Sequence, residues 1–307
     1  MITHYFKTVQ DAELRVLDTI RNGVWTHVVA PSDDELAALG RDFALDEAIL
    51  EDSKDFFEVP RMERSGGVSY FFTRYPYDEK DEDIDTAPLL IVIGESFVIT
   101  IAKRPVPQFA PFVNGKVSVV TTQKTKLFIN LIGAVTAAFE LELVRLRRIV
   151  HRNRLKLGRI GPKEIQRLVN YENGLNNMIA ALVPTNTWLN QVTNGNFIQL
   201  YNEDVELMED VVIANNQLIE SSRSVMKTIQ NVRSASEAIM TSRLNATIQT
   251  LTIITIILTI PTVVSSLYGM NVPLPFSGDP LAFWLILVAI MALVSGVVYA
   301  FKRSEWL

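Results

Sequence analysis

The chain has 307 residues and a net charge of −5; 48% of its residues are hydrophobic and 21% are charged. It contains no cysteine, which excludes disulfides and thiolate metal sites, and its acidic balance argues against a general nucleic-acid binder. The charge is distributed unevenly, because Asp279 is the only charged residue between Arg243 and Lys302. The sequence therefore predicts a soluble, acidic N-terminal part joined to a short apolar C-terminal part.

Residues 1–122 alternate β-rich and helical stretches, which predicts a mixed α/β cytoplasmic domain. Ser32 precedes three acidic residues and is expected to cap one helix, and residues 46–54 are expected to form a second short helix. Strands are expected where β-branched and aromatic residues cluster, at residues 25–30, 68–75, 88–94, 96–102 and 116–120.

Residues 123–196 are predicted to form a cytoplasmic helical hairpin. The first helix extends to Leu157, and Gly158 and Gly161-Pro162 then break the helical pattern. The second helix is expected over residues 163–183, followed by another break near 184–196.

A stalk helix is predicted over residues 197–245. No glycine or proline occurs between Phe197 and Pro261, so this helix is expected to continue without interruption into the membrane. A 3–4 spacing of apolar residues along it indicates helix packing, either within the chain or between copies. The residues in this stripe are Leu200, Leu207, Val211, Leu218, Val225, Ile229, Val232 and Ile239.

Two uncharged apolar segments, residues 246–267 and 281–301, are each long enough to cross a bilayer as a helix. The linker between them, residues 268–280, is short, so the two spans form a hairpin. Arg243 and the basic tail 302–307 flank its outer ends, which places both termini in the cytoplasm and the linker outside by the positive-inside rule. We therefore expect a multi-pass protein of the cell (inner or plasma) membrane.

One face of the first span carries polar residues at steps of 7, 3, 4 and 3, with Ile248 filling the vacant turn. These residues are Asn245, Thr252, Thr255, Thr259 and Thr262. Either the hydroxyls bond back to carbonyls of their own helix, or this face lines a path for water. One hairpin cannot enclose a pore, so the second interpretation requires a cyclic homo-oligomer with the first span inside. Such a lining suits a cation that keeps its water shell.

Tyr-Gly-Met-Asn at residues 268–271 follows the first span, a second span comes next, and the chain ends in Lys-Arg-Ser-Glu-Trp-Leu. This arrangement resembles the CorA family of magnesium and cobalt transporters, within the 2-TM-GxN superfamily. The resemblance implies a homopentamer with an outer selectivity ring of Gly269, Met270 and Asn271, supported by Tyr268. It also implies that Asn245 and Leu251 lie at the inner pore and hydrophobic gate, with either Thr259 or Ile260 at a middle constriction.

Two acidic clusters, at residues 77–86 and 202–210, are each compatible with a solvated charged surface. The resemblance implies a further role, in which carboxylates from neighbouring protomers bind regulatory Mg²⁺ and hold the pore closed. Asp210 matches the position on the long helix, with Glu206 and Glu209 beside it. Its partner is left open among Asp78, Asp81, Asp83 and Asp85.

The sequence thus predicts a divalent cation channel for Mg²⁺, and also Co²⁺ and Ni²⁺, driven by the membrane potential. Mg²⁺ is expected as both substrate and regulatory ligand, without an organic cofactor. The expected partners are hydrated divalent cations, the lipid bilayer and copies of the chain, but no nucleic acid. A zinc transporter of the same architecture and a non-conducting membrane-anchored coiled-coil scaffold remain as alternatives. No enzyme is expected, because the sequence has neither a nucleophile–base constellation nor a nucleotide motif.

Overall fold

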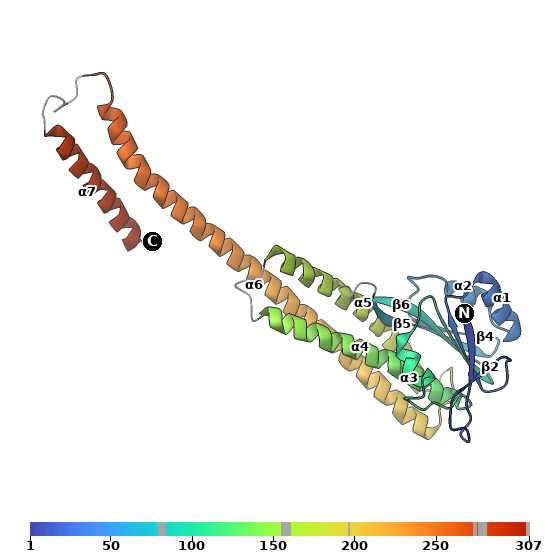
Figure 1. Ribbon diagram of the computed structural model, residues 1–307. Coiled ribbons are helices and arrows are strands. Elements are labelled where there is room, and N and C mark those ends of the chain that lie inside the picture. The colour runs from blue at the N-terminus through green and yellow to red at the C-terminus, as the bar shows by residue number, and fades with distance from the viewer. Residues whose placement is uncertain (79–83, 155–160, 196, 273–274, 276–280, 305–307) are drawn as a thin grey trace. The chain divides into compact units, whose positions relative to one another are not determined.

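The computed structural model describes residues 1–78, 84–154, 161–195, 197–272, 275 and 281–304 (Figure 1). The chain forms two compact units, Met1–Arg233 and Ser234–Leu307. The first unit contains the β-sheet and the helices that cover it, and the second contains two apolar helical segments.

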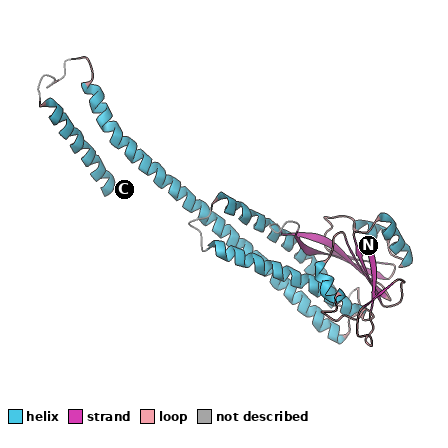
Figure 2. Cartoon of the chain, viewed as in Figure 1, coloured by secondary structure: helices cyan, strands magenta, loops and turns pink. Residues whose placement is uncertain are grey.

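The first unit is built on a seven-stranded sheet of order β2-β1-β3-β7-β6-β5-β4. Figure 2 shows the strands of this sheet in magenta and the helices in cyan. Neighbouring strands are antiparallel except β3 and β7, which are parallel. The strands are β1 Ile2–Phe6, β2 Arg15–Leu17, β3 Val24–Val29, β4 Arg61–Ser65, β5 Val68–Asp78, β6 Ile84–Ile93 and β7 Phe97–Ala102.

Four of the five predicted strands are confirmed with shifted ends, as β3, β5, β6 and β7. The strand expected at residues 116–120 is wrong, because this segment is an irregular loop. Its Ser118 hydroxyl accepts a hydrogen bond from the Lys7 ammonium at 3.0 Å, and Thr121 N donates to Lys7 O at 3.0 Å. The β-branched composition therefore reflects an anchored loop in which Val119 is buried, not sheet pairing.

Side chains alternate between the two faces of the sheet, as the period of a strand requires. Tyr70 and Phe72 face α1 Asp33–Asp42 and α2 Glu47–Asp52, whereas Phe71 faces the longer helices. The predicted Ser32 cap is confirmed: its hydroxyl accepts from Glu35 N, and the Glu35 carboxylate accepts from Ser32 N. The short elements η1 Pro107–Phe109 and α3 Ala110–Val113 connect the sheet to the helices.

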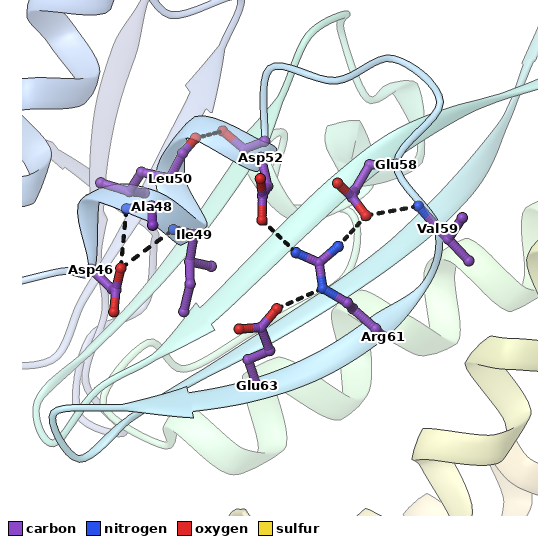
Figure 3. A network of polar contacts seen from close by, with 10 residues as sticks. Asp46, Ala48, Ile49, Leu50, Asp52, Glu58, Val59, Arg61 and Glu63 are labelled. Atoms are coloured by element: carbon purple, nitrogen blue, oxygen red, sulfur yellow. Dashed lines mark hydrogen bonds and ion pairs between the residues drawn. The ribbon is translucent and has the colours of Figure 1, made fainter.

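An arginine on the edge strand β4 holds the loop that follows α2 (Figure 3). The Arg61 guanidinium donates to the carboxylates of Asp52 and Glu63, each at 2.6 Å, and also to Glu58. It lies over the Phe72 ring, 4.3 Å from the centroid. One cation thus neutralises part of an acidic edge and packs on the core at the same time.

The second face of the sheet is covered by α4 Lys124–Arg154 and α5 Pro162–Thr193. The break predicted near 184–196 is wrong in its position, because α5 continues through Pro184 to Thr193. Proline removes one helical hydrogen bond at a cost of about 3 kcal/mol. Burial of Leu182, Trp188 and Leu189 around it compensates, at about 2 kcal/mol for each large apolar side chain.

The stalk helix α6 runs from Asn202 to Tyr268, so it begins five residues later than expected. Phe197 has φ +72°, a left-handed conformation that cannot start a helix. The predicted apolar stripe packs within the chain, since Leu218, Val225, Ile229 and Val232 are buried. Leu207 departs from the pattern and is partly exposed.

By length and composition, three helices in the described part of the chain could cross a membrane: α4, α6 and α7 Ala282–Arg303. Half of the apolar window of α4 is buried inside the structure, and its residues Leu127, Phe128 and Leu131 belong to the main core. The hydropathy of α4 is therefore accounted for by packing on the sheet. The corresponding windows of α6 and α7 are almost entirely unburied.

Candidate pore and regulatory site

The second unit exposes apolar side chains that water does not favour. None of the residues of α7 is buried, and Phe283 and Trp284 are both more than 60% exposed. On α6, Ile248 and Leu251 are also more than half exposed. Such continuous apolar surface on two helices of this length requires a lipid or protein environment.

Every threonine of the first span donates its hydroxyl proton to the carbonyl four residues earlier. The distances are 2.8 Å for Thr252, 2.9 Å for Thr255, 2.7 Å for Thr259 and 2.8 Å for Thr262. Thr247 and Thr250, which lie outside the predicted polar face, make the same bond. The back-bonds therefore do not distinguish a pore-lining face from a lipid-facing one, and the pore lining stays a prediction.

These bonds do determine what the hydroxyls can offer to a ligand. A hydroxyl has one proton and two lone pairs, so a back-bonded threonine presents only acceptor capacity. The water molecules around a cation point their protons outward and need acceptors. Asn245, whose exposed side chain has no hydrogen-bond partner among the described residues, adds an amide at the start of the span.

The Gly-Met-Asn sequence lies at the C-terminal end of α6. Gly269 N donates to Ser265 O at 3.0 Å, and Met270 N donates to Leu267 O at 3.3 Å, which closes the last helical turn. A Cβ on Gly269 would lie 3.2 Å from Ser265 O, so a side chain there would crowd this turn. Glycine thus keeps the helix end compact directly before the exposed Met270 and Asn271.

Asn271 and Tyr268 both remain accessible. The Asn271 side chain is exposed and makes no hydrogen bond within the part of the chain that the structure describes, and Tyr268 is 41% exposed. A free amide next to a compact helix end can present its oxygen to a ligand without first breaking an internal bond.

The acidic residues predicted to bind regulatory Mg²⁺ are only partly described. Glu206, Glu209 and Asp210 are exposed on α6. Asp78 ends β5, and Asp81 and Asp83 lie outside the described residues. Within the described ranges of this single chain, no three His, Asp or Glu side chains form a group able to hold a metal ion.

Asp85 has a partner that the sequence did not indicate. Its Oδ1 accepts a hydrogen bond from Asn177 Nδ2 on α5 at 3.3 Å and from Thr86 N at 2.7 Å. The contact spans 92 residues, so no local pattern could have predicted it. Among the described residues, Oδ2 of Asp85 has no hydrogen-bond partner.

A sheet-based first unit, one helix of 67 residues and a second apolar helix, both with unburied windows long enough to cross a bilayer, are typical of a membrane protein. The family model described as "CorA-like Mg2+ transporter protein" matches residues 21–303, and the chain belongs to this family.

Known relatives agree with this assignment over nearly the whole chain. The cobalt/magnesium transport protein CorA of Methanocaldococcus jannaschii is 23% identical over 306 residues, covering 92% of this chain and 91% of that protein. The complete structure of the CorA magnesium transporter from the same organism is similar with a TM-score of 0.88 at 20% identity, covering 100% of this chain and 99% of that one. The full-length CmaX protein is similar with a TM-score of 0.78 at 18% identity, covering 99% and 97%. These structural similarities show the fold.

Proposed function

We propose that the protein is a homopentameric channel that carries hydrated Mg²⁺, and also Co²⁺ and Ni²⁺, across the cell membrane. The observation that carries the proposal is Asn271, an exposed amide without an internal partner among the described residues, in an intact Gly-Met-Asn sequence at the end of α6. The family description and the name of the M. jannaschii relative, which refer to magnesium and cobalt transport, support the choice of ion.

The selectivity ring is formed by Gly269, Met270 and Asn271 of five copies, with Tyr268 supporting it from the last helical turn. Mg²⁺ releases its water reluctantly, so a ring that binds the shell water is better suited than one that must replace it. Five amide oxygens accept hydrogen bonds from the water molecules of that shell. The nearby linker contributes only Asp279 as a negative charge, so selection depends mainly on hydrogen bonds.

The first span lines the pore below this ring. Its acceptor-only hydroxyls favour hydrated cations over anions, which would need proton donors. Leu251 forms a hydrophobic gate beside Asn245 and Ile248, where a narrow apolar ring excludes water when closed. The remaining lining is supplied by Thr252, Thr255, Thr259 and Thr262.

The membrane potential supplies the driving force. Both termini lie in the cytoplasm and the linker lies outside, as the basic residues Arg243, Lys302 and Arg303 favour. A divalent cation that moves inward then gains about 4.6 kcal/mol per 100 mV, twice the value for one charge. This gain removes the need for a nucleotide-hydrolysing unit.

Cytoplasmic Mg²⁺ closes the pore by binding between protomers. Asp210, with Glu206 and Glu209 on the same exposed surface of α6, supplies one side of the site. A carboxylate among Asp78, Asp81, Asp83 and Asp85 of the neighbouring copy supplies the other. Bound Mg²⁺ cancels the repulsion between these carboxylates, and low Mg²⁺ releases the symmetric closed state.

A zinc transporter of the same architecture is the second candidate. Zn²⁺ prefers nitrogen and sulfur ligands. The sequence has no cysteine, and none of its histidines lies C-terminal to His151, so the two candidate spans and their linker contain neither ligand type. The oxygen groups of this region favour Mg²⁺. A non-conducting scaffold would give Asn271 no role in transport.

Ion uptake by the full-length protein in proteoliposomes tests the proposal. We expect Mg²⁺ uptake that exceeds Zn²⁺ uptake and that hexaamminecobalt(III), an inert mimic of a hydrated cation, inhibits. Asn271→Ala should reduce Mg²⁺ uptake at least tenfold, because five ring amides are lost together.

Asn231→Ala is the matched control, since Asn231 is also exposed on α6 and has no partner among the described residues. It should leave uptake unchanged. Equal uptake by Asn271→Ala and the wild-type protein would contradict the proposed filter, and uptake of Zn²⁺ in preference to Mg²⁺ would favour the second candidate.

A further inference from the structure

The tip of the α4–α5 hairpin carries a concentration of positive charge that transport does not explain. Residues 143–167 contain nine lysines and arginines and one acidic residue, Glu164, in a chain whose net charge is −5. We define the basic tip by the exposed residues Arg147, Arg148 and Arg152 at the end of α4 and Lys163 at the start of α5.

The charges of the basic tip are not neutralised within the described residues. None of its four side chains has an ion pair there. The one acidic residue of the segment is already engaged, because the Glu164 carboxylate accepts a hydrogen bond from Gly161 N at 3.1 Å and caps α5. Like charges held close together on folded helices repel one another, so this arrangement favours an anionic partner.

Contacts within the first unit determine which way the tip points. Lys126, near the start of α4, lies 3.5 Å from Glu203, near the start of α6. Leu182 O on α5 accepts from Asn215 on α6, and Glu172, nearer the start of α5, accepts from Arg233 at 2.9 Å. Thus α5 runs antiparallel to the part of α6 that lies in the first unit, and the tip lies at the Arg233 end of that part.

Helical rise sets the reach of the tip. Pro162 begins α5 ten residues before Glu172, so the tip extends about 15 Å beyond the Glu172–Arg233 pair. Along α6, Arg233 precedes the first residue of the apolar span, Ala246, by thirteen residues. The chain therefore keeps the start of the span within about 20 Å of Arg233.

We propose that the basic tip binds anionic phospholipid headgroups. The proposal rests on membrane insertion of the 246–267 span, but not on the ion that the protein carries. Basic clusters adjacent to a membrane-spanning helix are attracted to anionic lipids, and each exposed lysine or arginine contributes about a fivefold factor in association. The thirteen residues between Arg233 and Ala246 tether the first unit to the span, which raises the effective concentration of lipid headgroups around the tip.

Fluorescence transfer to labelled lipid headgroups tests this contact. The chain has no cysteine, so His151→Cys places a single donor label at the tip, at an exposed position between Arg148 and Arg152. The full-length labelled protein is reconstituted in nanodiscs of phosphatidylcholine, or of phosphatidylcholine with 30% phosphatidylglycerol, with an acceptor on a trace headgroup. We expect transfer at least twofold higher with the anionic lipid, and lost at high salt.

Charge reversal distinguishes lipid binding by the tip from a general electrostatic attraction of the protein to anionic lipid. Arg147→Glu, Arg148→Glu and Arg152→Glu together should reduce transfer in anionic nanodiscs to the zwitterionic level. The matched control reverses three exposed basic residues elsewhere in the first unit, Arg41→Glu, Arg64→Glu and Lys116→Glu, and should leave transfer unchanged.

Three results would overturn the proposal: transfer that does not depend on lipid charge, an equal loss in the control variant, or loss of the transfer in anionic nanodiscs when free inorganic phosphate is added at constant ionic strength. The last result would assign the tip to a soluble anion. Mg²⁺ uptake by the same variants is measured separately, so a failure of the proposed channel function remains distinguishable.

Discussion

At the residue scale, the C-terminal end of α6 and the hydrogen bonds of its threonine hydroxyls limit the chemistry of the proposed pore. Gly269 keeps the last helical turn compact, and the Asn271 amide stays free of internal bonds in the described chain. Back-bonded threonines present oxygens but no protons. All three features favour contact with the water shell of a cation.

Asp210→Ala should weaken inhibition by internal Mg²⁺, because it removes one carboxylate from the proposed regulatory site. We expect the concentration that halves uptake to rise at least threefold, as measured by uptake into proteoliposomes loaded with different Mg²⁺ concentrations. Asp42→Ala, at an exposed position on α1, is the control and should not alter it. Unchanged inhibition in Asp210→Ala would exclude this residue from the site.

The first unit should become less stable in acid because of His27. Burial beside Trp25 and Phe109 lowers the pKa of His27 from 6.5 to about 4. The unfolded chain therefore binds a proton between these pH values that the folded chain does not. Stability is lost as the pH falls from about 6.5 to 4, by about 3 kcal/mol in total.

Urea unfolding at pH 7 and pH 4.5 checks this expectation. His27→Gln should reduce the difference between the two stabilities, whereas His151→Gln, at an exposed position, should not. Burial also lowers the pKa of His4, so part of the acid sensitivity should persist in His27→Gln. An unchanged pH dependence in His27→Gln would show that its imidazole is not the responsible group.

At the element scale, α5 links the sheet to α6. Trp188 and Leu189 are buried in the main core, while Glu172 binds both Gln230 and Arg233 of α6 at 2.9 Å. The Glu172 side chain is 15% exposed, which protects this pair from solvent better than the surface pairs of α6. The packing of α5 therefore determines how firmly α6 is held where the first unit ends.

Glu172→Gln should destabilise the first unit by about 1–2 kcal/mol, because it weakens two hydrogen bonds and leaves a partly buried arginine without its counter-charge. Glu220→Gln is the matched control. Glu220 also pairs with an arginine on α6, Arg223, at 2.6 Å, but its side chain is 71% exposed, so the expected cost is below about 0.5 kcal/mol. Urea unfolding of the full-length protein in detergent measures both, and equal costs would argue against a special role of the α5–α6 pair.

At the scale of the whole molecule, one chain has two unburied apolar helices and, within its described residues, no group of three side chains able to hold a metal ion. A single hairpin cannot surround a pore, and the proposed regulatory site needs oxygen ligands besides the exposed carboxylates of α6. Assembly of several copies, as proposed above, would meet both requirements with one symmetric arrangement.

Native mass spectrometry of the detergent-solubilised protein should therefore detect five copies of the 34.5 kDa chain. After the same preparation is reconstituted in proteoliposomes, Mg²⁺ uptake should fall when an ionophore collapses the membrane potential, because the potential is the proposed driving force. A monomer that still transports Mg²⁺ would contradict the pentameric pore.

The sequence by itself determined the features that depend on neighbouring residues. The Ser32 cap follows from residues three apart, and the candidate spans follow from more than 20 uncharged residues in a row. The Gly-Met-Asn sequence after the first span is likewise a local feature, while its role as a filter remains a prediction. Local patterns carry these signals because helix capping and bilayer crossing are decided within one element.

Only the tertiary structure decided the order of the strands, the continuation of α5 through Pro184 and the bond between Asp85 and Asn177. It also showed that residues 116–120 form a loop anchored by Lys7 and that α4 owes its hydropathy to the core. Each of these outcomes depends on contacts between residues far apart in the chain. Their free energy outweighs local preference, and no local pattern in the sequence records it.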